Sequence, residues 1–150
     1  MEHSAATVGQ WSERATSATV TYTAEDKDGD RVLQITNSAA SGGPRIGKTI
    51  YPAGINTIYV SFMVRTVGSA TVNFSAYNGM ADGVRTTGTQ AEWAAYEFML
   101  DIKNKTYICY KNGVEADSGI LGADLDSQIT FRFGGSVKNG GCAFYDNIRI

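Results

Sequence analysis

Residues 57–66 read TIYVSFMVRT, and this stretch has the clearest period of two in the chain. One side of the alternation is apolar and carries Ile58, Val60, Phe62 and Val64. The other side is amphipathic and carries Tyr59, Ser61, Met63 and Arg65. Alternation of this kind predicts a β-strand from Thr57 to Thr66 with one face in a core and one face toward solvent.

Weaker copies of this pattern, separated by turn signals, recur on both sides of the stretch. Further strands are predicted around residues 19–23, 31–36, 45–51, 70–77, 84–87, 95–102, 106–111, 129–133 and 142–150. Asp28-Gly29-Asp30 and Asn112-Gly113 are typical of tight hairpin turns, and no segment has the period of a helix of three turns. The alternation places Phe62, Phe74, Phe98, Phe131 and Phe144 in the core.

Composition supports an all-β fold. The chain has 150 residues, with 17 Gly, 2 Pro and 19% charged residues. This length fits one domain over residues 1–150 that needs neither a disulfide nor a metal ion to fold. About ten short strands that each bury one face are most simply accommodated by two packed sheets. We therefore predict an all-β fold, a two-sheet antiparallel β-sandwich of the jelly-roll kind.

The charge balance excludes two broad classes of partner. A formal net charge of −2 provides no basic field for nucleic acid or for an anionic membrane surface. The start, MEHSAATVGQ, has neither the basic nor the apolar segment of a signal peptide, and the chain stops at Ile150 inside a strand-like run. We therefore expect a module of a longer protein.

Cysteines and acidic residues raise two further questions. Cys109 and Cys142 could form one bridge, but a domain of this size does not need it, so we expect free, buried thiols. No zinc site is expected, because the only histidine is His3. Residues 25–30, EDKDGD, could hold a structural calcium ion with help from Asp146, although a polar hairpin turn is the simpler interpretation, and no other cofactor is expected.

Several short motifs resemble the β-sandwich carbohydrate-binding modules attached to secreted bacterial glycanases and polysaccharide lyases. They are Gly9-Gln10-Trp11, residues 28–35 (DGDRVLQI), residues 41–45 (SGGPR), residues 59–64 (YVSFMV), Glu92-Trp93 and residues 144–150 (FYDNIRI). The central part of the chain, from Trp93–Tyr96 through Lys105–Gly113, looks more like concanavalin A-like sandwiches, in which a strand ending in Asn-Gly closes a hairpin. Both resemblances imply a jelly roll, but fold alone does not establish sugar binding.

The sequence argues against catalysis. Glu97 and Asp101 share a strand face but lie about 13 Å apart at ~3.3 Å per residue, farther than the paired carboxylates of glycosidases. Glu115 and Asp117 follow the Asn112-Gly113 turn, where acidic residues usually form a solvated rim. The strand motif of the concanavalin A-like hydrolases is absent, and a lyase would need a base that His3 is poorly placed to supply.

A carbohydrate-binding face requires fewer special groups than an active site. A few aromatic rings that stack on sugars and planar polar groups that form hydrogen bonds with hydroxyls are enough. Outward phase on consecutive strands predicts that Tyr59, Arg65, Asn73, Tyr77 and Arg85 share one sheet surface. Trp93 and Glu97 complete the candidate carbohydrate-binding set. The alternative for each residue is the ordinary solvated side of a sheet, and for Trp93 it is a plug at the edge of the core. Arg45 and Lys48 would suit an acidic glycan, but their strand face could not be assigned.

The leading hypothesis is a non-catalytic carbohydrate-binding module. It would hold an attached enzyme on a polysaccharide of the plant cell wall, as a secreted or cell-surface monomer. The rival hypothesis is a structural or adhesive β-sandwich of a bacterial surface protein that binds no glycan. A small lyase or hydrolase is a third, weaker alternative.

Overall fold

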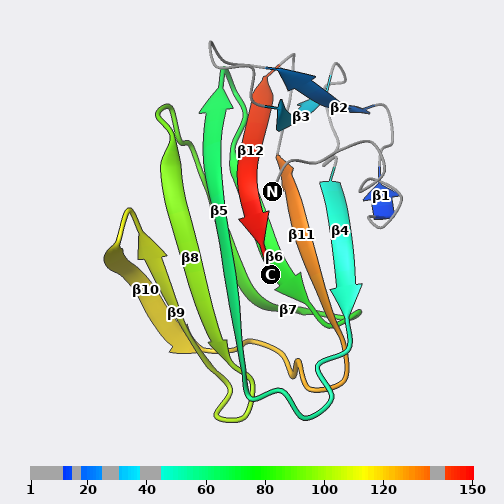
Figure 1. Cartoon of the computed structure of the whole chain (residues 1–150), viewed down its shortest axis with the longest axis vertical. Coiled ribbons are helices and arrows are strands. Elements are labelled where there is room, and N and C mark those ends of the chain that lie inside the picture. The colour runs from blue at the N-terminus through cyan, green and yellow to red at the C-terminus, as the bar shows by residue number, and fades with distance from the viewer. Residues whose placement is uncertain (1–11, 15–17, 25–30, 38–44, 136–140) are drawn as a thin grey trace.

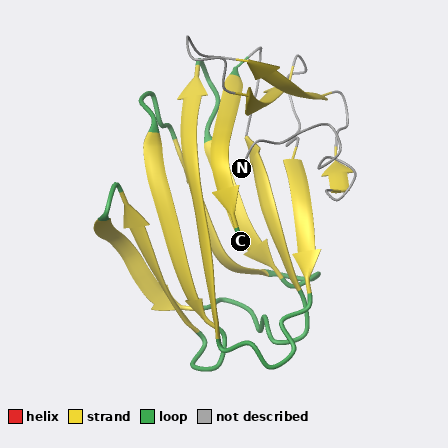
Figure 2. Ribbon diagram, viewed as in Figure 1, coloured by secondary structure: helices red, strands yellow, loops and turns green. Residues whose placement is uncertain are grey.

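The structure is a computed structural model that describes residues 12–14, 18–24, 31–37, 45–135 and 141–150. Within these residues the chain forms strands and loops, without a helix (Figure 2). The predicted features at Gly9–Trp11, residues 25–30 and Ser41–Pro44, together with His3, lie outside the described residues.

Two antiparallel sheets form the fold (Figure 1). The smaller sheet has the order β1-β4-β11-β6-β7, built from Ser12–Arg14, Arg45–Ile50, Ile129–Gly135, Val72–Tyr77 and Asp82–Gly88. The larger sheet has the order β10-β9-β8-β5-β12-β3-β2, built from Val114–Ile120, Thr106–Lys111, Ala94–Asp101, Thr57–Val67, Cys142–Arg149, Arg31–Asn37 and Ala18–Ala24. The predicted all-β sandwich is confirmed.

The core lies between the two sheets and is rich in aromatic side chains. Phe62, Phe74, Phe98 and Phe131 are all buried as predicted. Phe62 and Phe74 join the two sheets, with ring centroids 5.0 Å apart. The period-two pattern therefore identified the inward face of each central strand correctly.

Phe144 is buried, with 8% of its surface exposed, but its predicted direction into the space between the sheets is wrong. It lies opposite Arg65 on the outer face of the larger sheet, while its neighbour Tyr145 points inward and is fully buried. The Tyr145 hydroxyl donates a hydrogen bond to the Gly134 carbonyl and accepts one from the Asn73 amide. These two bonds satisfy a polar group that would otherwise be costly to bury.

Successive strands do not always lie side by side. β5 belongs to the larger sheet and β6 to the smaller one, so the chain crosses between the sheets at residues 68–71. The crossing passes close to the start of β12, where a Cβ added at Gly141 would lie 2.7 Å from the Ala70 amide nitrogen. Glycine at position 141 is therefore required for this close approach.

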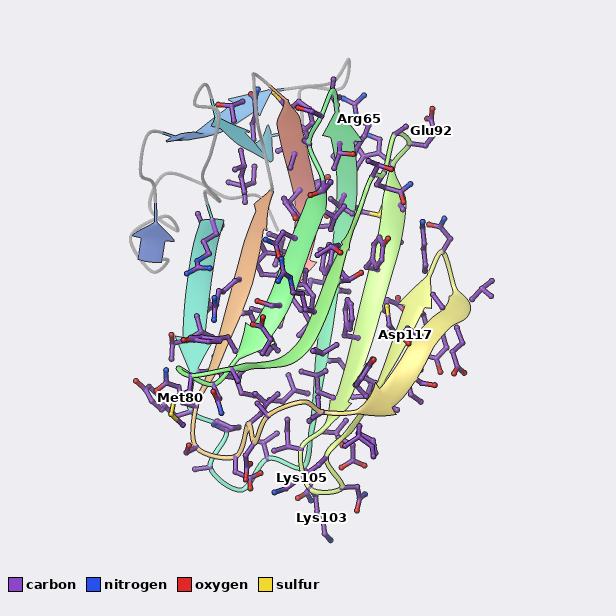
Figure 3. The ribbon with its side chains drawn as sticks, turned by 180° about the vertical axis from the view of Figure 1, so that it is seen from behind. Arg65, Met80, Glu92, Lys103, Lys105 and Asp117 are labelled. Carbon is purple, nitrogen blue, oxygen red and sulfur yellow. The ribbon has the colours of Figure 1, made fainter. Side chains whose placement is uncertain are left out.

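β9 and β10 extend the larger sheet beyond the smaller one at the left of Figure 1. The turn between them has positive φ at both Asn112 and Gly113, 52° and 79°, as the sequence predicts for a two-residue hairpin. Every residue of β10 is exposed, including Asp117, which is labelled in Figure 3. β10 is thus an exposed edge strand, whereas its partner β9 still buries Cys109 in the core.

Cys109 and Cys142 are free, as expected, but only Cys109 is buried, whereas Cys142 is half-buried. They lie on β9 and β12, with β8 and β5 between them. Three strand spacings amount to about 14 Å, too far for a disulfide. The described residues contain no helix that is long and apolar enough to cross a membrane.

Candidate functional site

A groove crosses the outer face of the larger sheet. Its first part encloses about 370 Å³ over β5, β8 and β9, where Tyr59, Ser61, Glu97, Met99 and Tyr110 project outward. Its second part encloses about 240 Å³ over β5, β8 and β12. There the outward side chains are Ser61, Met63, Ala95, Glu97, Asn147 and Arg149. Both parts share Ser61 and Glu97, so the two hollows are adjacent.

Strand register explains why these side chains meet. Tyr110, Glu97 and Ser61 lie directly opposite one another on β9, β8 and β5. Tyr59 is opposite Met99 on the next rung of the ladder. Residues in opposite positions of antiparallel strands point to the same side, so the two rungs form one continuous surface.

The two tyrosines stand on either side of Glu97. Their Cα atoms are separated by two strand spacings of ~4.8 Å across the sheet and by two residues of ~3.4 Å along the strand, which gives a distance of about 12 Å. Tyr59 is 68% exposed, whereas Tyr110 is half-buried. The groove therefore offers two aromatic rings, a carboxylate and two thioethers over a length greater than one sugar ring.

A β-bulge in β12 shapes the far end of the groove. The register between β12 and β5 shifts between Asp146 and Arg149, and Asn147 adopts a positive φ of 49°. The Asp146 carboxylate accepts a hydrogen bond of 2.7 Å from the Asn147 amide. The extra residue keeps Ile148 buried while Asn147 and Arg149 project over the hollow.

Arg65 and Trp93 lie beyond this end of the groove. The Arg65 guanidinium is 5.6 Å from the centre of the Trp93 ring and 5.1 Å from that of Phe144. Trp93 is 37% exposed, so it covers the arginine without being buried itself. Figure 3 shows Arg65 at the end of β5, close to the loop that carries Glu92. Arg65 is thus packed between two rings, and Phe144 is buried beneath it.

Three of the seven predicted site residues lie on the opposite side of the molecule. Asn73, Tyr77 and Arg85 belong to β6 and β7 of the smaller sheet, which Figure 3 brings to the front. The prediction that they share one surface with Tyr59 and Arg65 is therefore wrong, because the chain changes sheets after β5. Tyr77 is also occupied: the Arg132 guanidinium lies 3.2 Å from its ring centre, and its hydroxyl donates to the Gly79 carbonyl at 2.6 Å.

The face of Lys48 can now be assigned. Lys48 lies opposite Phe131 in the ladder between β4 and β11, so it takes the inward phase of the smaller sheet at its border. It is only half-exposed there and lies on the sheet opposite the groove. Lys48 therefore does not contribute to the groove.

The groove contains few groups that could act in catalysis. Glu97 is the only carboxylate among the described lining residues of both hollows. Asp101, two rungs away, accepts hydrogen bonds of 2.8 Å from the backbone amide and the side-chain amide of Asn104, and these bonds lower its pKa. In the described parts of the chain, no three His, Cys, Asp or Glu residues gather where they could hold a metal ion.

Sequence reasoning found Tyr59 and Glu97 but missed much of the groove. Tyr110 follows the alternation of its strand and could have been recognised by pairing residues 106–111 with 95–102. Asn147 and Arg149 could not be recognised from the sequence. The β-bulge that turns them toward the groove does not show in the alternation of apolar and polar residues. Ser61 and Met99 were visible as outward residues but gave no chemical signal of their own.

Comparison with known proteins supports the fold. No known protein family and no curated protein matches the chain. Among solved structures, a sialidase is similar over 95% of this chain with a TM-score of 0.69 and 13% identity. The chain spans 17% of that sialidase.

Two other similar structures cover most of both chains. The alginate lyase AlyC3 is similar over 85% of this chain and 76% of its own, with a TM-score of 0.62 and 10% identity. A family 11 carbohydrate-binding module from Clostridium thermocellum, in complex with a β-1,3-1,4-mixed-linked tetrasaccharide, is similar over 93% and 86%, with a TM-score of 0.53 and 18% identity. At these identities the comparisons establish the β-sandwich fold that the chain shares with these proteins.

Proposed function

We propose that the chain is a non-catalytic carbohydrate-binding module that holds a polysaccharide in the groove over β9, β8, β5 and β12. The observation that carries the proposal is the pair of tyrosines, Tyr59 and Tyr110, on either side of Glu97 in an open groove. Aromatic faces stack on the apolar faces of sugar rings, and the carboxylate accepts hydrogen bonds from hydroxyls.

The absence of a second carboxylate near Glu97 in the described groove supports binding without hydrolysis. Acid–base cleavage of a glycoside needs two such groups about 5–9.5 Å apart. The likeness to a carbohydrate-binding module of similar length gives further support. Two structural neighbours are enzymes, so this part of the proposal rests on the groove rather than on the comparisons.

The module would act by keeping an attached catalytic domain near its substrate. A tether turns the second encounter into an intramolecular event and raises the local concentration of enzyme on the polymer. The small share of the sialidase that this chain matches fits a module within a larger protein. We further propose a secreted or cell-surface location, a monomeric module and a polysaccharide of the plant cell wall as ligand.

Affinity electrophoresis against a panel of soluble plant polysaccharides tests the proposal. We expect at least one polymer to retard the protein, with a dissociation constant in the micromolar to millimolar range that is common for shallow, wet sites. If none of the polymers retards it, the structural or adhesive role without glycan binding is the better interpretation.

A further inference from the structure

Glu97 occupies a central position in the groove. It is exposed, and both hollows include it among their lining residues. No hydrogen bond or ion pair joins its carboxylate to another residue in the described portion of the structure. An extended ligand that fills both hollows must therefore pass directly over a charge that the protein itself does not neutralise.

Neighbouring charges add to this negative character. Glu115 on β10 lies opposite Tyr110, and Asp146 on β12 lies opposite Met63, so carboxylates border both ends of the groove. Arg149 is the one cationic lining residue in the described groove, and it is two strand spacings from Glu97, about 10 Å. Arg65 lies farther out and packs between Trp93 and Phe144.

We propose that Glu97 makes the groove selective for neutral polysaccharides over polymers rich in uronic acid or sulfate. A neutral sugar hydroxyl donates a charge-assisted hydrogen bond to the carboxylate, whereas a ligand carboxylate at the same place meets a like charge. A like charge at about 6 Å weakens binding by roughly tenfold at an intermediate effective dielectric. This inference rests on the proposed function and specifies its ligand class.

Isothermal titration of the intact chain with four soluble polymers tests the proposal. Two are neutral, a β-1,3-1,4-mixed-linked glucan and a β-1,4-galactan, and two are anionic, alginate and polygalacturonate. We expect the best neutral polymer to bind at least tenfold more tightly than either anionic polymer. Glu97→Gln keeps the size of the side chain but removes its charge, so it should weaken the neutral ligand about fivefold and reduce the preference over anionic polymers.

Glu97→Lys extends the test by reversing the charge. We expect this variant to bind the anionic polymers measurably, with an affinity that falls as salt is added. Glu92→Gln is the matched control, since Glu92 is an exposed glutamate on the loop before β8 and does not line the described groove. It should leave the selectivity unchanged.

The outcomes separate this inference from the proposed function. If an anionic polymer binds as tightly as the neutral ones and Tyr59→Ala weakens that binding, the module proposal stands and the charge selection is wrong. If Glu97→Gln leaves the preference for neutral polymers unchanged, the charge selection is also wrong. If no polysaccharide binds at all, both proposals fail.

Discussion

Ser61 of β5 lies directly opposite Glu97 of β8, at the point where the two hollows of the groove meet. The small side chain of Ser61 leaves room above the sheet, so the larger tyrosines and methionines around it form walls rather than a filled surface. Replacing Ser61 by Phe should close the groove without disturbing the core, because position 61 points outward.

We expect Ser61→Phe to abolish polysaccharide binding in titration calorimetry while leaving the urea unfolding midpoint nearly unchanged. Surface substitutions usually change stability by less than ~0.5 kcal/mol. Thr87→Phe is the control and should retain affinity, because Thr87 is exposed on β7 of the smaller sheet, away from the groove. Undiminished binding by Ser61→Phe would place the ligand outside the groove.

Core substitutions test the assignment of inward faces. Phe74→Ala and Phe131→Ala remove fully buried rings and should each lower the free energy of unfolding by about 3–5 kcal/mol. Phe144→Ala should cost less than either, because its ring lies on the outer face beneath Arg65. Urea denaturation of the three variants checks this order, and an equal loss for all three would mean that Phe144 belongs to the core.

Arg65 should stabilise the fold rather than only face a ligand. Its guanidinium contacts the rings of Trp93 and Phe144, and each such contact is worth about 0.5–1 kcal/mol at an exposed site. We therefore expect Arg65→Ala to lower the unfolding free energy by roughly 1–2 kcal/mol in thermal or urea denaturation. Arg85→Ala on β7 is the control, since Arg85 is exposed and should change stability by less than ~0.5 kcal/mol. Equal stability of the two variants would contradict the packing role.

Cys109 should make the free energy of unfolding decrease as the pH rises into the alkaline range. Burial, with a smaller effect from Asp117, raises the pKa of the Cys109 thiol to about 11. The unfolded thiol ionises near pH 8.5, so between that pH and about 11 the unfolded state loses a proton that the folded state retains. The stabilising difference is therefore complete below pH 8.5 and is lost as pH rises through this window.

Urea midpoints measured at pH 7.5 and pH 10 test this linkage. The decrease with pH should be smaller in Cys109→Ala than in the unchanged protein, because the variant lacks the titrating thiol. Ellman titration should also detect two thiols per chain after denaturation. Parallel pH profiles in the two proteins would show that Cys109 does not contribute.

The sequence predicted the sandwich and the inward residues because both depend on local alternation. Ile58, Val60 and Phe62 could only be buried together if the strand from Thr57 had one core face. The assignment of each strand to one of the two sheets does not follow from local alternation. It depends on whether the connection after Val67 turns back beside β5 or crosses to the other sheet, and both paths leave the same period.

This distinction explains the partial success with the candidate site. Tyr59 and Glu97 were placed correctly on one face because β5 and β8 are neighbours, whereas Asn73, Tyr77 and Arg85 were separated from them by the crossing. Phe144 was misplaced for another reason. Both Phe144 and Tyr145 can fill a core, and the choice depends on whether a buried hydroxyl finds partners, which Gly134 and Asn73 provide in three dimensions.

The groove tyrosines offer the most direct test of the account. Each stacking ring should contribute on the order of 1–2 kcal/mol, by analogy with aromatic pairs and their buried area. Isothermal titration should compare the unchanged protein with Tyr59→Ala, Tyr110→Ala and Tyr51→Ala, using the tightest polymer from the panel. Tyr51 is the control, since it is 73% exposed but lies at the end of β4 in the other sheet.

We predict that Tyr59→Ala and Tyr110→Ala each weaken binding by about 5- to 30-fold, that the double variant shows no detectable binding, and that Tyr51→Ala binds normally. Unchanged affinity in the Tyr59→Ala/Tyr110→Ala double variant would contradict the assignment of the groove as the polysaccharide site.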